Sequence, residues 1–247
     1  MPSDVPARCA LVTGGTKGIG RAITLRLAAD GLRVVACYAH DDAAAAGLLA
    51  DAAAAGLVVE GRRCDVTSPS AVADLARDFA DPGFDVVVNN AGFFRDRLLV
   101  MMPERDFDEV LAVSLRGAFL VLRQVLRPMI ARQRGRIVNI VSPTGVLGRP
   151  GQTNYAAAKA GLIGLTRSLA REVARYGITV NAVSAGLTDT PAVAALPAAV
   201  RAELLRGVPL ARLARPAEVA AAVSFLCSER AAYITGQVLA VDGGITT

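Results

Sequence analysis

The stretch CALVTGGTKGIG, residues 9–20, decides the fold of this 247-residue chain. A short apolar run ends in a glycine-rich turn with the spacing G-x3-G-x-G, and a helical pattern follows directly. Glycine lets a backbone approach a pyrophosphate closely, and the start of a helix offers free N–H groups and a positive dipole end. The turn therefore predicts a dinucleotide site, with a tight connection that binds nothing as the alternative. The residues of the expected site are Gly14, Thr16, Lys17, Gly18, Ile19 and Gly20.

Short apolar runs alternate with helical patterns along the rest of the chain. Continuous Val, Ile, Leu and Ala runs are typical of strands buried on both faces, and their alternation with helices predicts a parallel α/β sheet. The stretch from about 187 to 214 breaks the alternation and predicts a helical insertion over the sheet edge. We expect one domain over residues 8–247 after a flexible lead-in at 1–7. Strands are expected near 8–13, 32–37, 57–63, 85–88, 135–141, 178–183 and 237–241, and helices near 18–30, 41–55, 68–80, 104–132, 153–176 and 216–228.

The stretch SPTGVLGRPGQTNYAAAK, residues 142–159, has the side chains that favour acid–base chemistry. Tyr155 and Lys159 are four residues apart and share one face of a predicted helix. A positive charge beside a phenol favours the phenolate, so we expect Lys159 to lower the Tyr155 pKa from its ordinary value of about 10. Ser142 supplies a hydroxyl that can bind a substrate oxygen. Lys17 and Lys159 are the only lysines among 27 basic residues, which weighs against an incidental pair in an amphipathic helix.

Small or polar residues follow several of the predicted strands. Because ligands bind outside the carboxyl ends of the strands in an open parallel sheet, we expect these residues to lie along one crevice. Capping of a turn is the alternative for Asp65, and pinning of neighbouring loops is the alternative for Asn89. The expected crevice contains Gly14, Asp65, Asn90, Ser142 and Gly186.

The residues after the second predicted strand favour NADP over NAD. NAD sites usually have a carboxylate there that binds the ribose 2′-hydroxyl, and here Tyr38 has that place. Asp41 and Asp42 come later and are expected to cap the next helix. Lys17 would attract a 2′-phosphate. His40, the only histidine, is expected to be a solvated loop residue, with a contact to the phosphate as the alternative.

Composition excludes several other classes of function. No apolar run reaches the ~18 residues of a membrane span, and the N-terminus lacks the apolar core of a signal peptide, so we expect a cytoplasmic protein. The net charge of +5 is spread over scattered arginines, which argues against nucleic-acid binding. The four cysteines have neither metal nor redox spacing, so we expect free thiols and no metal site.

Together these motifs resemble the short-chain dehydrogenase/reductase family. TGGTKGIG at 13–20, NNAG at 89–92 and Ser142…Tyr155-x3-Lys159 match its cofactor and catalytic signatures, and the resemblance runs from about Arg8 to VDGG at 241–244. The stretches at 151–183 and 231–244 are most similar to the 3-oxoacyl-[acyl-carrier-protein] reductases and related polyketide ketoreductases. The resemblance implies a Rossmann-like, doubly wound sheet of seven strands, an NADPH-dependent ketone–alcohol interconversion and a homotetramer.

The resemblance also implies a role for each matching residue. Tyr155 would give a proton to the forming alkoxide, Lys159 would bind the nicotinamide ribose and lower the Tyr155 pKa, and Ser142 would hydrogen-bond the carbonyl oxygen. The remaining cofactor contacts would be Asp65 and Val66 at the adenine, Asn90, Ala91 and Gly92 along the ribose, and Gly186 and Thr188 near the nicotinamide carboxamide.

Three residues depart from the family pattern. Ser114 stands where the family usually has an Asn that holds a water in the proton relay to the active-site lysine. Ala185 replaces the usual Pro after the sixth strand, which frees the backbone. Pro143, directly after Ser142, removes one backbone N–H. None of the three deletes the Ser-Tyr-Lys set, so we expect an active enzyme.

The resemblance implies an acyl-carrier protein as the partner that presents the substrate. Arg132, Arg134 and Arg175 are the candidates for docking it, with ordinary solvated arginines as the alternative. The expected entrance for the substrate is formed by Phe93, Phe94, Arg95, Leu147 and the segment 187–210.

Three functions stay open at this point. The first is a 3-oxoacyl thioester reductase acting on fatty acid or polyketide intermediates. The second is a reductase or dehydrogenase of another small ketone or alcohol. The third is a weakly active, NADP-binding structural or regulatory subunit.

Overall fold

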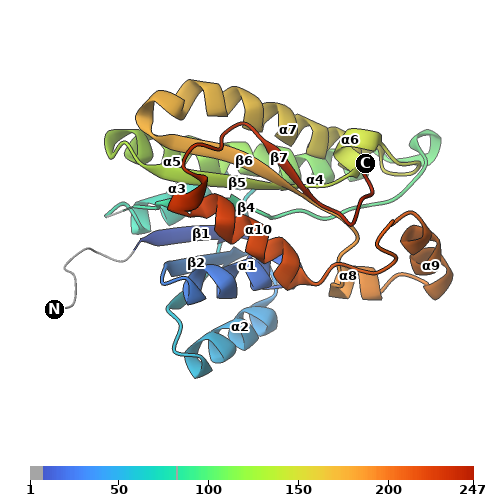
Figure 1. The fold of residues 1–247 in the computed structure, drawn as a ribbon, viewed down its shortest axis with the longest axis horizontal. Coiled ribbons are helices and arrows are strands. Elements are labelled where there is room, and N and C mark those ends of the chain that lie inside the picture. The colour runs from blue at the N-terminus through green and yellow to red at the C-terminus, as the bar shows by residue number, and fades with distance from the viewer. Residues whose placement is uncertain (1–7, 82) are drawn as a thin grey trace.

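The computed structural model describes residues 8–81 and 83–247, so the expected lead-in at 1–7 lies outside the described residues. Within them, seven strands form one parallel sheet in the order β3-β2-β1-β4-β5-β6-β7 (Figure 1). The strand order reverses between β1 and β4, which is the doubly wound arrangement that the sequence predicts. The strands are β1 (Cys9–Thr13), β2 (Arg33–Tyr38), β3 (Val59–Arg63), β4 (Val86–Asn89), β5 (Gly135–Val141), β6 (Ile178–Ala185) and β7 (Val238–Val241).

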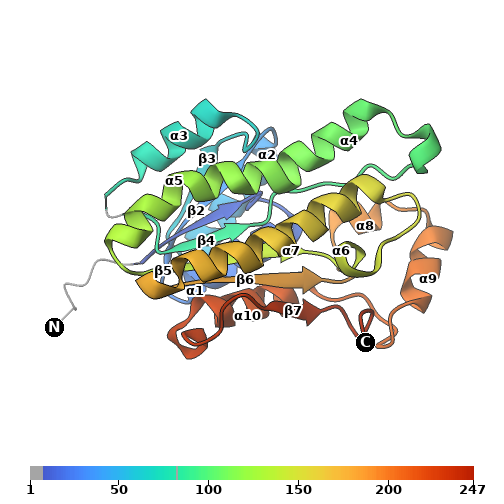
Figure 2. The same cartoon turned by 90° about the horizontal axis from the view of Figure 1, so that it is seen from above.

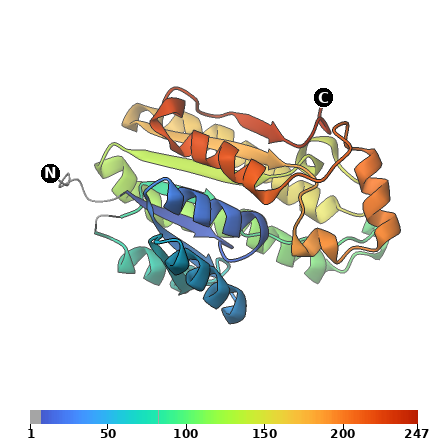
Figure 3. The same cartoon turned by 60° about the horizontal axis from the view of Figure 1, so that its bottom comes forward.

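Helices cover both faces of the sheet (Figures 2 and 3). Side chains alternate along each strand, so Leu11 of β1 packs with Val121 and Leu169, whereas its neighbour Val12 packs with Val223 on the opposite face. Apolar cores therefore hold the sheet between α3, α5 and α7 on one side and α1 and α10 on the other. The longer helices are α1 (Gly18–Ala29), α2 (Asp42–Ala54), α3 (Pro69–Asp78), α4 (Glu104–Leu111), α5 (Gly117–Ala131), α7 (Thr153–Val173) and α10 (Pro216–Cys227).

The helix predicted over 104–132 is not uniform. A π-helical turn, η2 (Ala112–Arg116), joins α4 to α5. Turns of this kind are rare and often occur at functional sites. The insertion at 187–214 is helical as predicted, with α8 (Pro191–Ala194) and α9 (Ala198–Arg206). The short helix α6 (Thr144–Leu147) was not predicted, because four residues between Pro143 and Gly148 have too little pattern to indicate a helix.

Three features of composition can be followed into the structure. All four cysteines are buried free thiols, as expected. Asp41 caps the start of α2 by accepting a hydrogen bond from the Ala44 backbone N–H, also as expected. In the described part of the chain, no helix has the length and apolar character needed to cross a membrane.

A buried carboxylate ties three strands together at the amino-end edge of the sheet. Asp85 directly precedes β4, and its Oδ2 accepts from the Cys9 backbone N–H of β1 at 3.0 Å. Its Oδ1 accepts from Nε and Nη2 of Arg134, at 3.1 and 2.7 Å. The Arg136 backbone N–H of β5 donates to the Asp85 carbonyl at 2.9 Å. Asp85 therefore sets the alignment of β1, β4 and β5.

Replacing Asp85 by Ala is expected to lower the free energy of unfolding by about 3 kcal/mol, because it leaves a buried N–H and an arginine without their partner. Denaturant unfolding followed by circular dichroism measures the change. The control is Asp74→Ala, which removes the exposed pair between Asp74 and Arg77 and should change the unfolding free energy by less than about 0.5 kcal/mol. Equal effects of the two substitutions would contradict the role given to Asp85.

Candidate active site

A cavity of about 930 Å³ opens at the carboxyl ends of the strands. It collects residues from the turns after β1, β2, β4, β5 and β6, which confirms that most of the predicted strand ends share one crevice. Asp65, Val66 and Ser114 are not among the residues that line it. The predicted residues that do line it are Gly14, Thr16, Lys17, Gly18, Ile19, Gly20, Tyr38, Asn90, Ala91, Gly92, Ser142, Tyr155, Lys159, Gly186 and Thr188.

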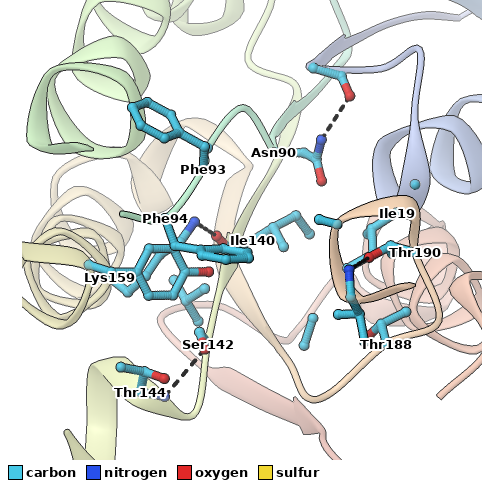
Figure 4. A pocket seen from close by; sticks show the side chains of 18 of the residues that line it. Ile19, Asn90, Phe93, Phe94, Ile140, Ser142, Thr144, Lys159, Thr188 and Thr190 are labelled. Carbon is cyan, nitrogen blue, oxygen red and sulfur yellow. Dashed lines mark hydrogen bonds between the residues drawn. The ribbon is translucent and has the colours of Figure 1, made fainter. Parts of the chain in front are cut away.

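The glycine-rich turn is fixed by hydrogen bonds from the neighbouring strand end (Figure 4). The Asn90 side-chain amide donates to the carbonyls of Thr13 and Gly14, at 2.9 and 3.0 Å. In return, the Thr13 hydroxyl oxygen accepts from the backbone N–H groups of Asn90 and Ala91, at 2.9 and 3.0 Å. The ends of β1 and β4 are therefore locked to each other.

This close contact requires glycine at two positions. A Cβ on Gly20 would lie 2.1 Å from the Gly14 carbonyl oxygen and 2.5 Å from the Asn90 amide nitrogen. Gly14 has a φ of +60°, which glycine adopts without strain. Within the described residues, no side chain caps the N-terminus of α1, and the first residues of this helix line the cavity. The turn can therefore hold an anionic group such as a pyrophosphate.

Asp65 and Val66 lie beside the crevice rather than in its lining. The Asp65 carboxylate caps a turn by accepting from the Thr67 backbone N–H and hydroxyl, at 2.9 and 2.8 Å. The Val66 side chain packs against α5, where a Cβ on Gly117 would lie 2.7 Å from it. In this structure Asp65 therefore acts as a turn cap, which was the alternative role expected for it.

Ser142, Tyr155 and Lys159 meet at one end of the cavity. The Lys159 ammonium is buried and donates to the Ile140 carbonyl at 2.8 Å (Figure 4). It lies 5.5 Å from the centre of the Tyr155 ring. Burial lowers the pKa of Lys159 to about 8. Burial also raises the pKa of Tyr155 to about 12, and a hydrogen bond with Ser142 acts in the opposite direction.

The direction of the Tyr155 shift corrects an expectation. The sequence suggested that Lys159 lowers the Tyr155 pKa, but the pKa is raised in this structure, because loss of solvent around the phenol outweighs its other contacts. The result is a tyrosine that stays protonated at neutral pH. Such a group can act as a proton donor, whereas a phenolate could not.

Ser114 lies behind this cluster, in the π-helical turn η2. It is buried, and its hydroxyl has no hydrogen-bond partner among residues 8–81 and 83–247. A Cβ on Gly92 would lie 3.1 Å from the Ser114 hydroxyl and 3.4 Å from the Lys159 ammonium, so both groups face the same glycine. A buried hydroxyl of this kind can hydrogen-bond an ordered water.

Opposite charges meet where the cavity reaches the end of β2. The Lys17 ammonium donates to Asp41 Oδ2 at 2.6 Å, and this hydrogen bond is the main reason why the Asp41 pKa is lowered. A hydrogen bond with Asp42 raises the pKa of the Tyr38 phenol. His40 is exposed and lines the cavity. The charge of Lys17 is therefore shared with an aspartate, which the sequence did not predict.

The expected substrate entrance is largely in place. Phe93, Phe94 and Leu147 line the cavity, and the Phe94 and Tyr155 rings meet edge to face with their centres 6.4 Å apart. Arg95 does not line the cavity, because its guanidinium pairs with Glu109 at 2.8 Å. The insertion 187–214 contributes Leu187, Thr188, Thr190, Pro191, Ala192, Val193, Leu204 and Gly207 to the lining.

The three arginines suggested for carrier docking lie away from the cavity mouth. Arg134 pairs with Asp85, and Arg132 donates to the Phe84 carbonyl at 2.7 Å, so both lie at the amino-end edge of the sheet. Arg175 stacks on Tyr176, directly before β6 begins. The cavity opens at the opposite, carboxyl-end edge.

Sequence reasoning missed three groups near Ser142, Tyr155 and Lys159. The Ile140 carbonyl, the Asp96 carboxylate and the Gln152 amide all take part in hydrogen bonds there. A backbone carbonyl leaves no trace in a sequence. Gln152 directly precedes the helix with Tyr155, but its burial depends on how distant segments pack.

Comparisons with known proteins agree with this geometry. Residues 14–246 match a family model described as Enoyl-(Acyl carrier protein) reductase. The chain is 41% identical over 246 residues to 3-oxoacyl-[acyl-carrier-protein] reductase FabG of Vibrio cholerae, which covers 98% of each chain. It is 43% identical over 242 residues to 3-oxoacyl-[acyl-carrier-protein] reductase of Synechocystis, covering 97% of each. It is also 43% identical over 240 residues to 3-oxoacyl-[acyl-carrier-protein] reductase FabG of Escherichia coli, covering 96% of this chain and 97% of the relative.

The matches extend over almost the whole chain and include the glycine-rich turn and the Ser-Tyr-Lys cluster. The chain belongs to the short-chain dehydrogenase/reductase family.

Proposed function

We propose that this protein uses NADPH to reduce a 3-oxoacyl thioester, held on an acyl-carrier protein, to the 3-hydroxyacyl thioester. The observation that carries the proposal is that Ser142, Tyr155 and Lys159 line the same cavity as the open N-terminus of α1. The similarity over nearly the full length to 3-oxoacyl-[acyl-carrier-protein] reductases supports this substrate class. Fatty acid and polyketide intermediates both contain this functional group.

The cavity fits the cofactor that the family implies. The glycine-rich turn leaves backbone N–H groups for a pyrophosphate, and Lys17 places a cation near the end of β2. When NADPH is bound, it supplies a hydride to the substrate carbonyl carbon. Lys159 would hold its nicotinamide ribose. The other residues proposed to hold it are Gly14, Thr16, Gly18, Ile19, Gly20 and Tyr38, with Asn90, Ala91 and Gly92 along the ribose and Gly186 and Thr188 at the carboxamide.

Negative charge develops on the substrate carbonyl oxygen during reduction, and the chain's own donors meet it there. The Ser142 hydroxyl hydrogen-bonds that oxygen, which stabilises the transition state more than the ground state. Tyr155 gives its proton to the same oxygen. Lys159 contributes a positive charge below its pKa of about 8. We assign to Ser114 the role of holding a water that links the Lys159 ammonium to solvent. This role is supported by the position of the two groups, since both face Gly92.

Asp65 and Val66 are proposed to flank the adenine. They follow β3 closely, at the edge of the sheet where the cavity opens, which supports this assignment. Asp65 would do so with a carboxylate that also caps its own turn.

The segment with α8 and α9 is proposed as a lid over the substrate. Gly18 of the glycine-rich turn and Thr190 at the start of α8 are in close contact, since a Cβ on Gly18 would lie 3.3 Å from the Thr190 methyl. A movement of this segment would therefore open the cavity at the glycine-rich turn and at the substrate side together.

A homotetramer is the proposed assembly. Exposed apolar side chains at two separate places support it: Phe119 lies on α5, and Leu239 lies on β7 with Tyr233 in the segment before it. Arg132, Arg134 and Arg175 lie at the sheet edge opposite the cavity, so a carrier docked on them would serve the active site of a neighbouring copy.

The matching family model is described as an enoyl-(acyl carrier protein) reductase, and this description suggests enoyl thioester reduction as a second function. An enoyl thioester reductase would add hydride and a proton across a carbon–carbon double bond, not a carbonyl group. The two reactions are separated by offering a 3-oxoacyl thioester and a 2-enoyl thioester to the same enzyme.

Replacing Tyr155 by Phe is expected to lower kcat for acetoacetyl thioester reduction roughly 10²- to 10⁴-fold, because the substrate oxygen loses its proton donor. The measurement is NADPH oxidation with acetoacetyl and crotonyl thioesters, both carrier-bound and free. NADPH binding, followed by fluorescence, should be retained in the variant. Turnover of crotonyl but not acetoacetyl thioester would rule out the proposed function, and equal rates for wild type and Tyr155→Phe would rule out the mechanism.

The pH profile of the reduction should decline on its alkaline side. Since the pKa of Lys159 is lowered to about 8, the lysine is charged below that pH and loses its charge above it. The pKa of Tyr155 is about 12, so the tyrosine stays protonated throughout the range. We expect kcat/KM for the thioester to be level near pH 6–7 and to fall about tenfold per pH unit above the Lys159 pKa. A level profile up to pH 10, with the fold intact by circular dichroism, would contradict this assignment.

Replacing Asp41 by Asn should strengthen NADPH binding selectively. The substitution removes a negative charge beside the expected 2′-phosphate and releases Lys17, while an amide at this position retains the helix cap. The dissociation constant for NADPH is expected to fall about fivefold, and that for NADH to change less than twofold. Fluorescence titration of both cofactors gives the comparison, with Lys17→Ala as the variant expected to act in the opposite direction. Parallel changes for the two cofactors would show that Lys17 does not read the phosphate.

A further inference from the structure

A chain of hydrogen bonds leads from the loop after β4 to the catalytic serine. The Gln152 side-chain nitrogen donates to both carboxylate oxygens of Asp96, at 2.9 Å each. The Gln152 side-chain oxygen accepts from the Thr144 hydroxyl at 3.2 Å. The Thr144 backbone N–H then donates to the Ser142 hydroxyl oxygen at 3.3 Å (Figure 4). These four residues come from three separate segments. Thr144 joins the two parts of the chain, because its hydroxyl donates to Gln152 and its backbone N–H donates to Ser142.

The carboxylate fixes the direction of the first two bonds in the chain, whereas the backbone N–H of Thr144 donates to Ser142 in any case. A carboxylate can only accept hydrogen bonds, so the Gln152 amide nitrogen must face Asp96 and its oxygen must face Thr144. The Thr144 hydroxyl must then donate. The Ser142 oxygen accepts from the Thr144 backbone on one side, which leaves the Ser142 hydrogen to be donated on the other side, where Tyr155 lies. That hydrogen is the one the proposed reaction needs at the substrate oxygen.

Burial makes this arrangement costly to disturb. Gln152 is only 5% exposed, although glutamine is usually a surface residue. Without Asp96, its amide would be left buried and poorly satisfied, or would turn over and present a donor to the donating Thr144 hydroxyl. A backbone hydrogen bond of 2.7 Å from Arg97 N–H to the Gly151 carbonyl ties the same two segments together next to the pair.

The side-chain hydrogen bonds of both members are made to protein groups. Asp96 does not line the cavity. Gln152 lines it, but its nitrogen is bound to Asp96 and its oxygen to Thr144. Their bonds lead to a bound substrate through Thr144 and Ser142, which makes them positioning residues rather than catalytic ones.

We propose that Asp96 and Gln152 form a positioning pair that orients the Ser142–Thr144 turn, so that the Ser142 hydroxyl points at the oxygen atom that Tyr155 protonates. This inference rests on the proposed function, because it concerns the same carbonyl oxygen. It adds to that function the residues that set the geometry of its donor.

Asp96→Asn tests the pair, because the amide keeps the shape of the carboxylate but no longer fixes the direction of the chain. We expect kcat for the 3-oxoacyl thioester to fall roughly 10- to 100-fold, since small errors in the placement of a catalytic donor have large effects on rate. KM for the thioester and the dissociation constant of NADPH should each change less than twofold. A purely structural role would lower the melting temperature and leave kcat unchanged at temperatures where the variant is folded.

The exchange variant Asp96→Asn with Gln152→Glu provides the rescue. In this variant the carboxylate introduced at position 152 accepts both from the amide introduced at position 96 and from the Thr144 hydroxyl. The Thr144 hydroxyl thereby regains an acceptor that cannot donate, while the bond between positions 96 and 152 runs in the reverse direction. We expect kcat to return to within about fivefold of wild type. The matched control is Asp108→Asn, which makes the same chemical change at an exposed position on α4 and should leave kcat as it is.

A readout without substrate separates this inference from the proposed function. In wild type and Asp108→Asn, the Gln152 side-chain amide protons should exchange slowly with solvent by NMR, and in Asp96→Asn more than tenfold faster. A wild type that reduces no 3-oxoacyl thioester would refute the proposed function, while the exchange rates would still test the pair. Asp96→Asn with wild-type kcat, an exchange variant no better than Asp96→Asn, or unchanged amide exchange would each overturn the positioning role.

Discussion

The contact between the Asn90 side chain and the carbonyls of Thr13 and Gly14 is the constraint on which the site depends. It joins the ends of two adjacent parallel strands at the point where the strand order reverses. The contact leaves no room for a side chain at Gly20, and it sets the direction in which α1 leaves the turn. The open N-terminus of α1 and the strand ends that hold Ser142 and Gly186 are thereby brought to one cavity. The parallel sheet supplies the edge, and Asn90 fixes the geometry of the turn at its centre.

Burial controls the chemistry within that cavity. It moves the pKa of Lys159 down to about 8 and the pKa of Tyr155 up to about 12, so both groups shift toward their neutral forms. A neutral phenol and a lysine that is still charged at neutral pH suit proton donation to a developing alkoxide. The Ile140 carbonyl holds the lysine in place, and the Ser142 hydroxyl opposes part of the tyrosine shift. The proposed reaction uses a proton donor that the fold itself keeps protonated.

Periodicity and strand ends predicted most of this molecule. Continuous apolar runs indicated the buried parallel strands, and the residues that follow them indicated the crevice, because carboxyl ends of parallel strands share an edge. The π-helical turn at Ser114 was not predicted, because one inserted residue hardly changes the apolar pattern of a long helix. The pairing of Lys17 with Asp41 joins residues 24 positions apart, and it depends on where the end of β2 meets the turn. The rise of the Tyr155 pKa also could not be predicted, since burial is a property of packing. Asp65 lies at the carboxyl-end edge of the sheet, as predicted. Its hydrogen bonds to Thr67 depend on the conformation of the local turn, which the sequence pattern does not show.

The central claim is that this cavity directs hydride to a carbonyl carbon. Its most direct test is to incubate the enzyme with acetoacetyl thioester and NADPH bearing deuterium at both C4 positions, and to locate the label by mass spectrometry. We expect one deuterium at C3 of a 3-hydroxybutyryl thioester. Absence of deuterated hydroxy product, together with label in a saturated butyryl thioester when crotonyl thioester is supplied, would contradict it.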